Sequence, residues 1–370
     1  MRSDPVLRRA AISWARGAVV TPQRLWPVLR EHGGVEGLLS AGPGELLAWL
    51  GSEERALAVL RSVEDTAAER WAGQAEIAGM RVVTAFDEEY PPLLSEISDP
   101  PFLLFASGNL ERLRLPAVGV VGSRAATRYG RDVAARLARD LAAAGVTIVS
   151  GFARGVDHAA HEAALGSPGG TVAVLGCGLD VEYPREHATL KRAMLSRDLV
   201  LSEFPPGTEP RPSNFPVRNR IIAGLCAGVV VVEASRRSGS LITARLANDF
   251  GRDVFAVPGS VFSQTSIGTH ELLRDGAILC RGAEDVLSEL FPAVGAGRAS
   301  VAAASAAKAA LSDEARRVWE TLLREEDASA EDLAQATDLP AATVLAALFE
   351  LEEAGLAVLG EGGRYGIRRS

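Results

Sequence analysis

The sequence predicts an α/β protein built on a doubly wound parallel sheet, flanked by a small helical N-terminal domain and a C-terminal winged helix. Two observations lead to this fold class. Between residues 116 and 290, short apolar β-branched runs alternate with helix-length segments, as expected of strands covered on both faces. Residues 311–370 instead have the order of three helices and a hairpin, which is typical of a winged helix-turn-helix.

Residues 1–80 are predicted to form the small helical domain, of the SAM or helix-hairpin-helix type. Thr21-Pro22 opens its first clear helix, and apolar residues recur at helical spacing, as at Leu25, Val28 and Leu29. Such helix–turn–helix units serve either as DNA-binding modules or as plain packing and interaction domains. The acidic balance of this part of the chain favours the second.

The central domain is predicted over residues 81–290. Short strands are expected at 81–84 and 102–105, followed by six buried strands at 117–121, 146–149, 171–175, 199–202, 229–232 and 254–257. Helices are expected between them, for example over 130–143 and 157–165. A βαβ series of this kind makes a parallel sheet, and ligands of such sheets bind outside the carboxyl ends of the strands.

A stretch of small residues, 291–310, is predicted to link this domain to the winged helix at 311–370. Ser312, Ser329 and Pro340 are expected to start its three helices, the second with a capping box, and a hairpin follows.

The third helix of the winged helix is acidic, although it occupies the place of a recognition helix. It contains three glutamates and neither Lys nor Arg, whereas basic residues gather in the wing and tail at Arg364, Arg368 and Arg369. Contacts to a major groove are normally made by cations. We therefore expect this domain to contact protein, or to touch DNA only weakly through its wing.

Composition indicates a globular protein of two or three domains. The 370 residues are 47% hydrophobic and 23% charged, and no apolar run is long enough for a membrane helix. The three cysteines, Cys177, Cys226 and Cys280, lie far apart, which argues against a disulfide scaffold or a zinc site. This usage fits a reducing compartment, so we expect a cytoplasmic protein without membrane contacts.

Charge is distributed unevenly along the chain. The net charge is −8, but residues 116–290 hold 19 basic against 18 acidic residues, a net of +1. Only two of the 39 cations are lysines, and arginine suits bidentate phosphate contacts and base stacking. A GC-rich genome would produce the same arginine bias, so composition alone does not establish nucleic-acid binding.

Two loops at predicted strand ends carry glycine beside arginine. The first is Gly122-Ser123-Arg124, where glycine lets a phosphate approach the backbone while a hydroxyl and a guanidinium hold it. A plain tight turn is the alternative there. The second is Ser150-Gly151-Phe152-Ala153-Arg154. His158 and His161 follow it, but a third ligand is missing, so no metal site is predicted.

Two further loops open helices. One is Asn214-Phe215-Pro216-Val217-Arg218-Asn219-Arg220, whose arginines oppose the helix dipole unless an anion lies there, and whose Phe215 offers a stacking face. The other is Arg236-Arg237-Ser238-Gly239-Ser240, an anion nest of small residues. All four loops lie at one predicted sheet edge. We expect six arginines to line a shared trough there: Arg124, Arg154, Arg218, Arg220, Arg236 and Arg237.

The same loops lack catalytic motifs. Neither a P-loop, a nucleophile elbow nor a dinucleotide fingerprint occurs. The few acids near the edge are Asp157, Asp180, Glu203 and Glu233, each interpreted as a helix cap or as a residue that orients an arginine. A binding surface is therefore expected, without enzyme activity, cofactor or metal.

Taken in order, these motifs resemble the DNA-processing protein A family (DprA, also called Smf). The resemblance runs from about residue 99 to 282, and its most specific part is the Phe-Pro-x-Arg-Asn-Arg block from Phe215 to Arg220. It implies an extended Rossmann-like domain that binds single-stranded DNA and dimerises. It further implies a protein that protects incoming strands and loads the RecA recombinase onto them during natural transformation.

By matching motifs, the resemblance gives Arg124 and the Phe215–Arg220 block a DNA-binding role. It places Gly122, Ser123, Ser150, Gly151 and Ser238–Ser240 around the phosphates. Phe152 departs from the smaller aliphatic residue usual in the family. For the dimer we expect an apolar face that includes Val261, Phe262, Ile267, Leu272 and Leu273.

Two other functions stay open at this point. A nucleotide-binding enzyme of the phosphoribohydrolase type would need a Pro-Gly-Gly-x-Gly-Thr-x-x-Glu signature, and the nearest segment, from Ser238 to Arg245, lacks the glutamate. A transcription regulator acting through the winged helix is disfavoured by the acidic third helix.

Overall fold

The computed structural model describes residues 22–62, 66–85, 87–294, 311–325, 327–354, 356–360 and 363–367. The chain divides into two compact units, Met1–Leu290 and Phe291–Ser370. Most of the predicted linker, and both Arg368 and Arg369, lie outside the described residues. In the part of the chain that the structure covers, no helix is long and apolar enough to cross a membrane.

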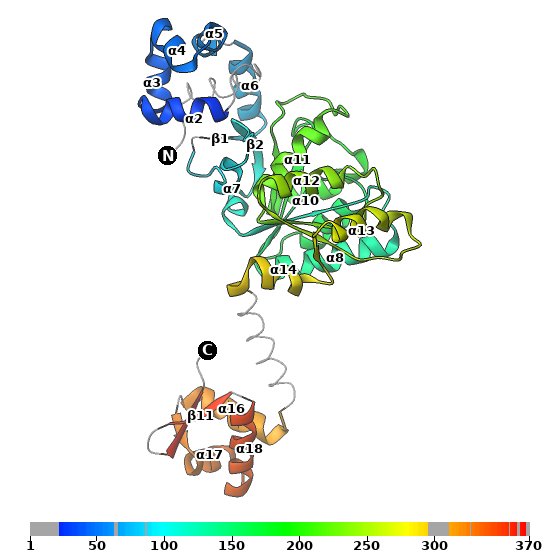
Figure 1. The fold of residues 1–370 in the computed structure, drawn as a ribbon. Helices are drawn as coiled ribbons and strands as arrows, with labels where there is room; N and C mark the ends of the chain where they lie inside the picture. Colours follow the sequence, from blue (N-terminus) through cyan, green and yellow to red (C-terminus); the bar gives the residue numbers. More distant parts are fainter. Residues whose placement is uncertain are drawn as a thin grey trace. The chain divides into compact units, whose positions relative to one another are not determined.

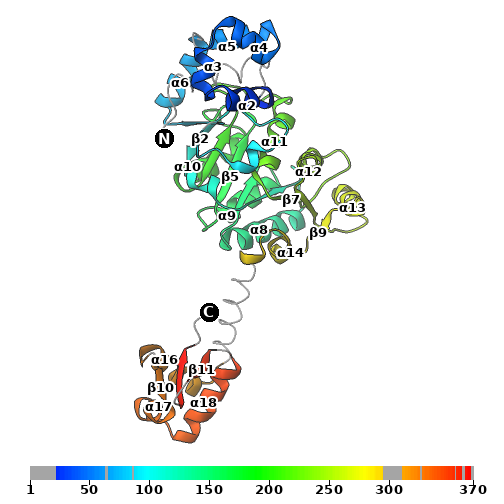
Figure 2. The same cartoon turned by 60° about the vertical axis from the view of Figure 1, so that its left-hand side comes forward.

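Among the described residues, a nine-stranded sheet forms the centre of the first unit, in the order β1-β2-β6-β5-β4-β3-β7-β8-β9. Figure 2 shows β2, β5, β7 and β9 following one another across the unit. The strands are β1 (Arg81–Thr84), β2 (Leu103–Gly108), β3 (Ala117–Val121), β4 (Thr147–Ser150), β5 (Thr171–Leu175), β6 (Leu199–Ser202), β7 (Gly228–Val231), β8 (Asp253–Ala256) and β9 (Ile278–Leu279). Strands β3 to β9 are parallel, whereas β2 is antiparallel to both β1 and β6. The predicted doubly wound sheet is confirmed, with an antiparallel extension at one edge.

Helices cover both faces of this sheet. On one face, α7 (Pro92–Ser95), α11 (Asn214–Leu225) and α12 (Ser240–Asp249) pack on an apolar core shared with the strands. The other helices of the sheet are α6 (Thr66–Ile77), α8 (Arg128–Ala143), α9 (Val156–Ala164), α10 (Ala188–Arg197), α13 (Ile267–Arg274) and α14 (Ala283–Leu290). Of these, α6 and α10 share the core of the opposite face.

The strand order reverses at β3, which pairs with β4 on one side and with β7 on the other. The chain builds outward from β3 to β6 and then returns through α11 to β7. In doubly wound sheets, ligands bind outside the carboxyl ends of the strands at such a reversal. The loops that follow β3 and β7 therefore flank the expected site.

The N-terminal helices have a core of their own. The helices α2 (Pro22–Glu31), α3 (Gly34–Ser40), α4 (Pro43–Leu50) and α5 (Glu53–Ser62) cluster together (Figure 1). Leu25, Leu38 and Leu46 are fully buried between them, and Phe102, just before β2, joins this core. Helix α6, although it precedes residue 80, packs against the sheet instead.

The second unit is a winged helix, as predicted. Its elements are α16 (Asp313–Glu325), β10 (Asp327–Ser329), α17 (Ala330–Thr337), α18 (Ala341–Glu353), β11 (Ala357–Leu359) and β12 (Arg364–Ile367). Ser329 forms the expected capping box with Asp332, and Pro340 is the N-cap of α18. Strand β10, which pairs with β12, is an addition to the predicted elements.

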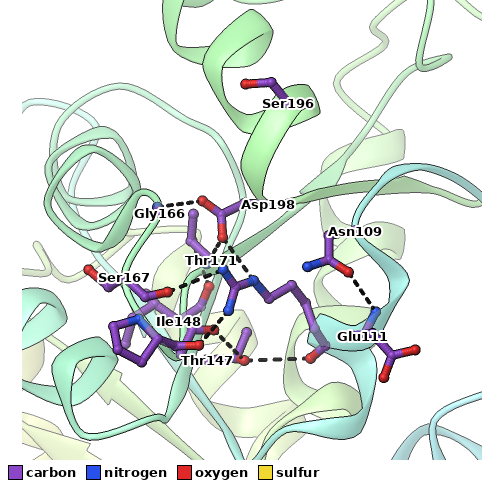
Figure 3. A network of polar contacts seen from close by, with 12 residues as sticks. Asn109, Glu111, Thr147, Ile148, Gly166, Ser167, Thr171, Ser196 and Asp198 are labelled. Carbon is purple, nitrogen blue, oxygen red and sulfur yellow. Dashed lines mark hydrogen bonds and ion pairs between the residues drawn. The ribbon is translucent and has the colours of Figure 1, made fainter.

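A buried ion pair fastens the antiparallel extension to the parallel strands (Figure 3). Asp198, fully buried before β6, accepts the Thr171 N–H (3.1 Å) and pairs with Arg112 (Nε to Oδ1, 3.0 Å). Arg112 lies in η1 (Leu110–Arg114), directly after β2, and also donates to the carbonyls of Ser167 and Pro168. Removing one partner of such a pair leaves an uncompensated buried charge.

A neutral histidine is buried between α9 and the sheet. His161 Nδ1 lies 2.7 Å from Thr171 Oγ1, and that hydroxyl donates its proton to the Ile148 carbonyl. Thr171 must therefore accept from His161, which places the imidazole proton on Nδ1. Nε2 has no partner among the described residues. Burial lowers the pKa of His161 to about 3.

We predict that His161 contributes to acid unfolding. Below about pH 6.5 the unfolded chain protonates this imidazole while the folded chain does not, so stability falls by about 1.4 kcal/mol per pH unit. His161→Asn, whose amide N–H replaces Nδ1–H, should flatten the fall in unfolding free energy between about pH 6 and about pH 4. Urea unfolding at a series of pH values measures this. A slope equal to the wild-type slope would exclude the contribution.

Candidate nucleic-acid interface

A cleft of about 660 Å³ opens where the strand order reverses, between the ends of β3 and β7. It is lined by the loops after these strands and by the first turns of α11 and α12. The sequence-predicted residues that line it are Gly122, Ser123, Arg124, Phe215, Arg218, Asn219, Ser238, Gly239 and Ser240. Segments that are more than a hundred residues apart in the chain thus meet at one site.

The N-terminus of α8, next to the cleft, is already occupied by a carboxylate of the protein. Glu233, which is 3% exposed and follows β7, accepts hydrogen bonds from the backbone N–H (2.8 Å) and the hydroxyl (2.6 Å) of Thr127, the N-cap of α8. Gly130 is required here because a Cβ would lie 2.3 Å from the carboxylate. No phosphate is therefore needed at this helix end.

The start of α9 also has a carboxylate of the protein in its first turn. Asp157, in the first turn of α9, accepts the N–H groups of Gly151 (3.1 Å) and Ala153 (3.2 Å). Burial raises the pKa of this carboxyl, and the charge of Arg218 opposes that rise. Asp157 thus stabilises the loop after β4.

The N-termini of α11 and α12 face the cleft without a carboxylate. Neither helix has an acidic residue in its first turn, and neither N-cap makes a side-chain capping hydrogen bond. At the start of α12 the hydroxyls of Ser238 and Ser240 lie 2.8 Å apart. Backbone N–H groups at helix starts favour anions. Two of the four helix starts at this edge thus lack a carboxylate. The first three N–H groups of α12 make long hydrogen bonds (3.2–3.4 Å) to Ser238 Oγ and to the carbonyls of Ser238 and Gly239.

Arg218 forms the floor of the cleft. Its side chain is 4% exposed and donates to the carbonyls of Gly151 (2.6 Å) and Val174, at the ends of β4 and β5, and to Asn219 Oδ1 (3.2 Å). Burial lowers the pKa of Arg218 to about 10, so the guanidinium stays charged at neutral pH. Two of its five N–H donors, both on Nη1, are engaged by these carbonyls and a third, on Nε, by Asn219, so Arg218 has a structural role in addition to its expected contact with an anion.

Phe215 stands at the rim between two kinds of side chain. The guanidinium carbon of Arg124, which is exposed, lies 5.0 Å from the centre of the ring, and the Tyr183 ring centre is 5.7 Å away at 41°. Cation–π and aromatic contacts of this kind hold a ring in place, and Phe215 stays partly exposed. Tyr183, which the sequence analysis did not select as a site residue, belongs to the cleft.

Arg220 does not line the cleft, so the expectation of a shared trough that includes it is wrong. Its guanidinium binds both oxygens of Glu203 (2.6 and 2.8 Å) and one oxygen of Asp99 (3.1 Å). Residues two apart on a helix point to different sides, so Arg218 and Arg220 cannot face the same space. Arg220 fastens α11 to β6 and to the segment before β2.

The remaining arginines lie around the cleft rather than in it. Arg154 pairs with Glu186 and lines a neighbouring cleft of about 290 Å³, which shares Arg124, Tyr183 and Phe215 with the first. Arg236 pairs with Glu271 (3.2 Å), and Arg237 is exposed. Of the six predicted arginines, Arg124 and Arg218 line the main cleft.

Two residues of the second loop are part of the core. Ser150 is fully buried and donates to the Val120 carbonyl (2.6 Å), so it is not open to a phosphate. Phe152 has φ +58° and turns its ring inward, where it is 2% exposed and contacts His161 and His187. Asn214 donates to the Gly176 carbonyl (3.1 Å).

Two of the acids near the edge act as interpreted from the sequence: Glu233 binds the N-cap residue of α8, and Glu203 orients Arg220. Asp180 instead accepts the Gly207 N–H (2.9 Å), and Asp157 accepts N–H groups of the loop after β4 while Gly155 is the N-cap of α9. Among the described residues, no group of three or more His, Cys, Asp or Glu side chains is arranged to hold a metal ion.

Comparison with known proteins gives a consistent result. Residues 81–291 match the family model of the DNA recombination-mediator protein A, and residues 302–363 match the DprA winged helix domain. DNA processing protein DprA of Streptococcus pneumoniae is 51% identical over 203 residues, which are 55% of this chain and 72% of that protein. A putative DprA of Mycobacterium tuberculosis (strain H37Rv) is 40% identical over 305 residues, covering 79% and 78% of the two chains.

Two solved structures are also similar. The X-ray structure of DprA from Streptococcus pneumoniae has a TM-score of 0.66 at 39% identity, and covers 78% of this chain and 99% of that one. A structure on the single-stranded DNA binding mode of Helicobacter pylori DprA has a TM-score of 0.53 at 32% identity, with 57% and 96% covered. The chain therefore belongs to the DNA recombination-mediator protein A family, the DprA/Smf family that its motifs indicate.

Proposed function

We propose that this protein binds single-stranded DNA in the cytoplasm, protects it, and loads RecA recombinase onto it during natural transformation and recombination. Family membership supports a role in DNA processing and recombination. The observation that carries the proposal is the cleft at the strand reversal, where two helix starts without a carboxylate meet an exposed arginine and an aromatic ring.

A single strand fits this cleft by its chemistry. Phosphates are favoured at the first turns of α11 and α12 and beside Arg124, and an unpaired base has a free face to stack on Phe215. Paired bases inside a duplex do not offer that face. The site thus favours unpaired nucleic acid with little dependence on base identity.

Arg218 is proposed as a positioning residue. Because its Nη1 donates to the carbonyls of Gly151 and Val174, it holds the loop after β4 and presents positive charge to the cleft from below. Glycine at 151 fits this arrangement, since a Cβ would lie 2.6 Å from the guanidinium.

The alternative, a phosphoribohydrolase-type enzyme, gains no support from the carboxylates near the cleft. Both oxygens of Glu233 accept hydrogen bonds, and Asp157 is buried beneath the loop that it stabilises. Groups committed in this way are poorly placed to act on a bound nucleotide. We therefore propose a binding function rather than catalysis.

We also propose that the protein forms a homodimer through its Rossmann-like domain. Val261 and Phe262, between β8 and α13, are 76% and 93% exposed. Neighbouring large apolar side chains with this much exposed surface are unusual in a monomer. Ile267, Leu272 and Leu273 lie on the adjacent α13 and are partly buried.

Replacing Arg124 with Ala should weaken binding of single-stranded DNA of any sequence. The slope of log K against log salt should fall by about 0.7 for each phosphate that the variant no longer neutralises. Fluorescence anisotropy with labelled oligonucleotides over a salt series measures both quantities. Arg128→Ala is the matched control, because Arg128 is a 90% exposed arginine of α8 that pairs with Asp132 outside the cleft. An unchanged slope for Arg124→Ala would remove Arg124 from the binding surface.

Replacing Phe215 with Ala should cost about 1–3 kcal/mol of binding free energy, the usual value of one stacked base. Phe215→Leu separates stacking from packing, because leucine retains apolar volume but offers no aromatic face. Stacking predicts that both variants bind weakly. If Phe215→Leu binds like the wild type, the ring acts by packing alone.

Phe262→Asp should shift the protein from dimer to monomer, because burying a carboxylate in an apolar interface is unfavourable. Analytical ultracentrifugation reports the oligomeric state. Ile77→Asp, at a 90% exposed apolar position of α6, serves as the control. A Phe262→Asp protein that sediments as a dimer would place the interface elsewhere.

A further inference from the structure

Helix α18 has an apolar face that its own domain does not cover. Leu345 and Phe349, one turn apart, are 52% and 61% exposed, with the exposed Ala342 and Ala346 beside them. Other residues of α18 face the core of the winged helix: Val344, Ala347, Leu348 and Leu351. Side chains three or four apart share one side of a helix. The exposed set is therefore a continuous apolar stripe.

The end of this stripe is negatively charged. Glu352 and Glu353 are exposed in the last turn of α18, which contains no basic residue. Carboxylates at the C-terminus of a helix are unfavourable, because they lie at the negative end of its dipole. Glu350, by contrast, accepts the N–H and the hydroxyl of Ser312 (2.7 Å each). Cations from outside the domain would relieve the charge of Glu352 and Glu353.

The arginines of the domain do not supply the cations that a DNA-reading face needs. Of the four that the structure describes in this unit, three are engaged: Arg364 pairs with Asp327 and Asp332, Arg316 pairs with Asp313, and Arg317 donates to a carbonyl. The fourth, Arg324, is exposed in the last turn of α16 and does not belong to α18. Phosphate contacts by exposed Lys or Arg normally dominate affinity for duplex DNA. A stripe of Leu, Phe and Ala with an acidic end is suited to a different partner.

We propose that this face of α18 docks an amphipathic helix of a partner protein, with apolar side chains one turn apart and Lys or Arg beside them. Leu345 and Phe349 supply the apolar contact, as in the packing of one helix against another. Ala342 and Ala346 allow a close approach between the helices, because the axial distance depends on the side chains at the contact. Glu352 and Glu353 select a basic partner and fix its direction.

The test is a selection of peptides from a random display library on the immobilised full-length chain, with counter-selection on the Leu345→Asp/Phe349→Asp variant. We expect enriched peptides with paired apolar residues and neighbouring Lys or Arg. Their affinity, measured by anisotropy, should fall at least tenfold in the double variant, as for the loss of a central hot spot. It should also fall in Glu352→Arg/Glu353→Arg and at high salt.

Matched controls lie on α16, where Leu323 is 48% exposed and Glu325 is also exposed. Leu323→Asp and Glu325→Arg should leave peptide binding unchanged. All substituted side chains are exposed, so the thermal unfolding midpoint should stay at the wild-type value. If the Leu345→Asp/Phe349→Asp variant unfolds, Leu345→Ala/Phe349→Ala replaces it in the counter-selection and in the affinity measurement.

Three outcomes would overturn the proposal. One is the absence of peptides that depend on Leu345 and Phe349. The second is loss of binding to a duplex oligonucleotide in the Leu345→Asp/Phe349→Asp variant, which would make this a DNA face. The third is loss of self-association in that variant, which would make the occupant a second copy of the chain. Single-stranded DNA binding by the cleft should be unaffected in each case, so the two proposals fail separately.

Discussion

The cleft depends on one buried guanidinium. Arg218 joins the carbonyl ends of β4 and β5, lies near the ring of Phe215 and faces the buried Asp157. Parallel strands leave carbonyl groups at their carboxyl ends, and a cation that donates to several of them removes an unsatisfied polar surface. The same cation makes the floor of the cleft positive. Strand termination and anion attraction are thus two results of one side chain.

Carboxylates of the protein lie at two of the four helix starts around the cleft and are absent from the other two. Glu233 occupies the start of α8 and Asp157 serves the loop before α9, whereas α11 and α12 have no such acid. Because helix starts attract anions equally well from inside or outside the protein, internal occupation directs an external anion to the other two. We therefore propose that a DNA strand lies across α11 and α12.

The sequence allowed the sheet to be predicted closely, because six short apolar runs bounded by turns determine where strands form. The bounds of these six strands agree within one residue, as with β4 at Thr147–Ser150 against the predicted 146–149, whereas β2 extends to Gly108, beyond the predicted 102–105. Helix α11 starts at Asn214, within the segment predicted to open a helix, since Pro216 is tolerated in a first turn. No sequence pattern predicts the inward orientation of Phe152, because its positive φ is unusual for phenylalanine. The contact between Glu233 and Thr127 joins residues 106 positions apart in the chain, and no local sequence pattern predicts it.

Net charge says little about binding until the partners of each charge are known. Around the cleft, the acids Asp157, Glu203 and Glu233 are all engaged by groups of the fold, so they add little repulsion for a phosphate chain. In α18, Glu352 and Glu353 lie exposed beside an apolar stripe, and their charge acts outward. A chain with a net charge of −8 is therefore consistent with a DNA cleft in one unit and a surface for a basic protein in the other. The two surfaces therefore differ in which charges have partners within the fold, and the net charge of the chain does not show this difference.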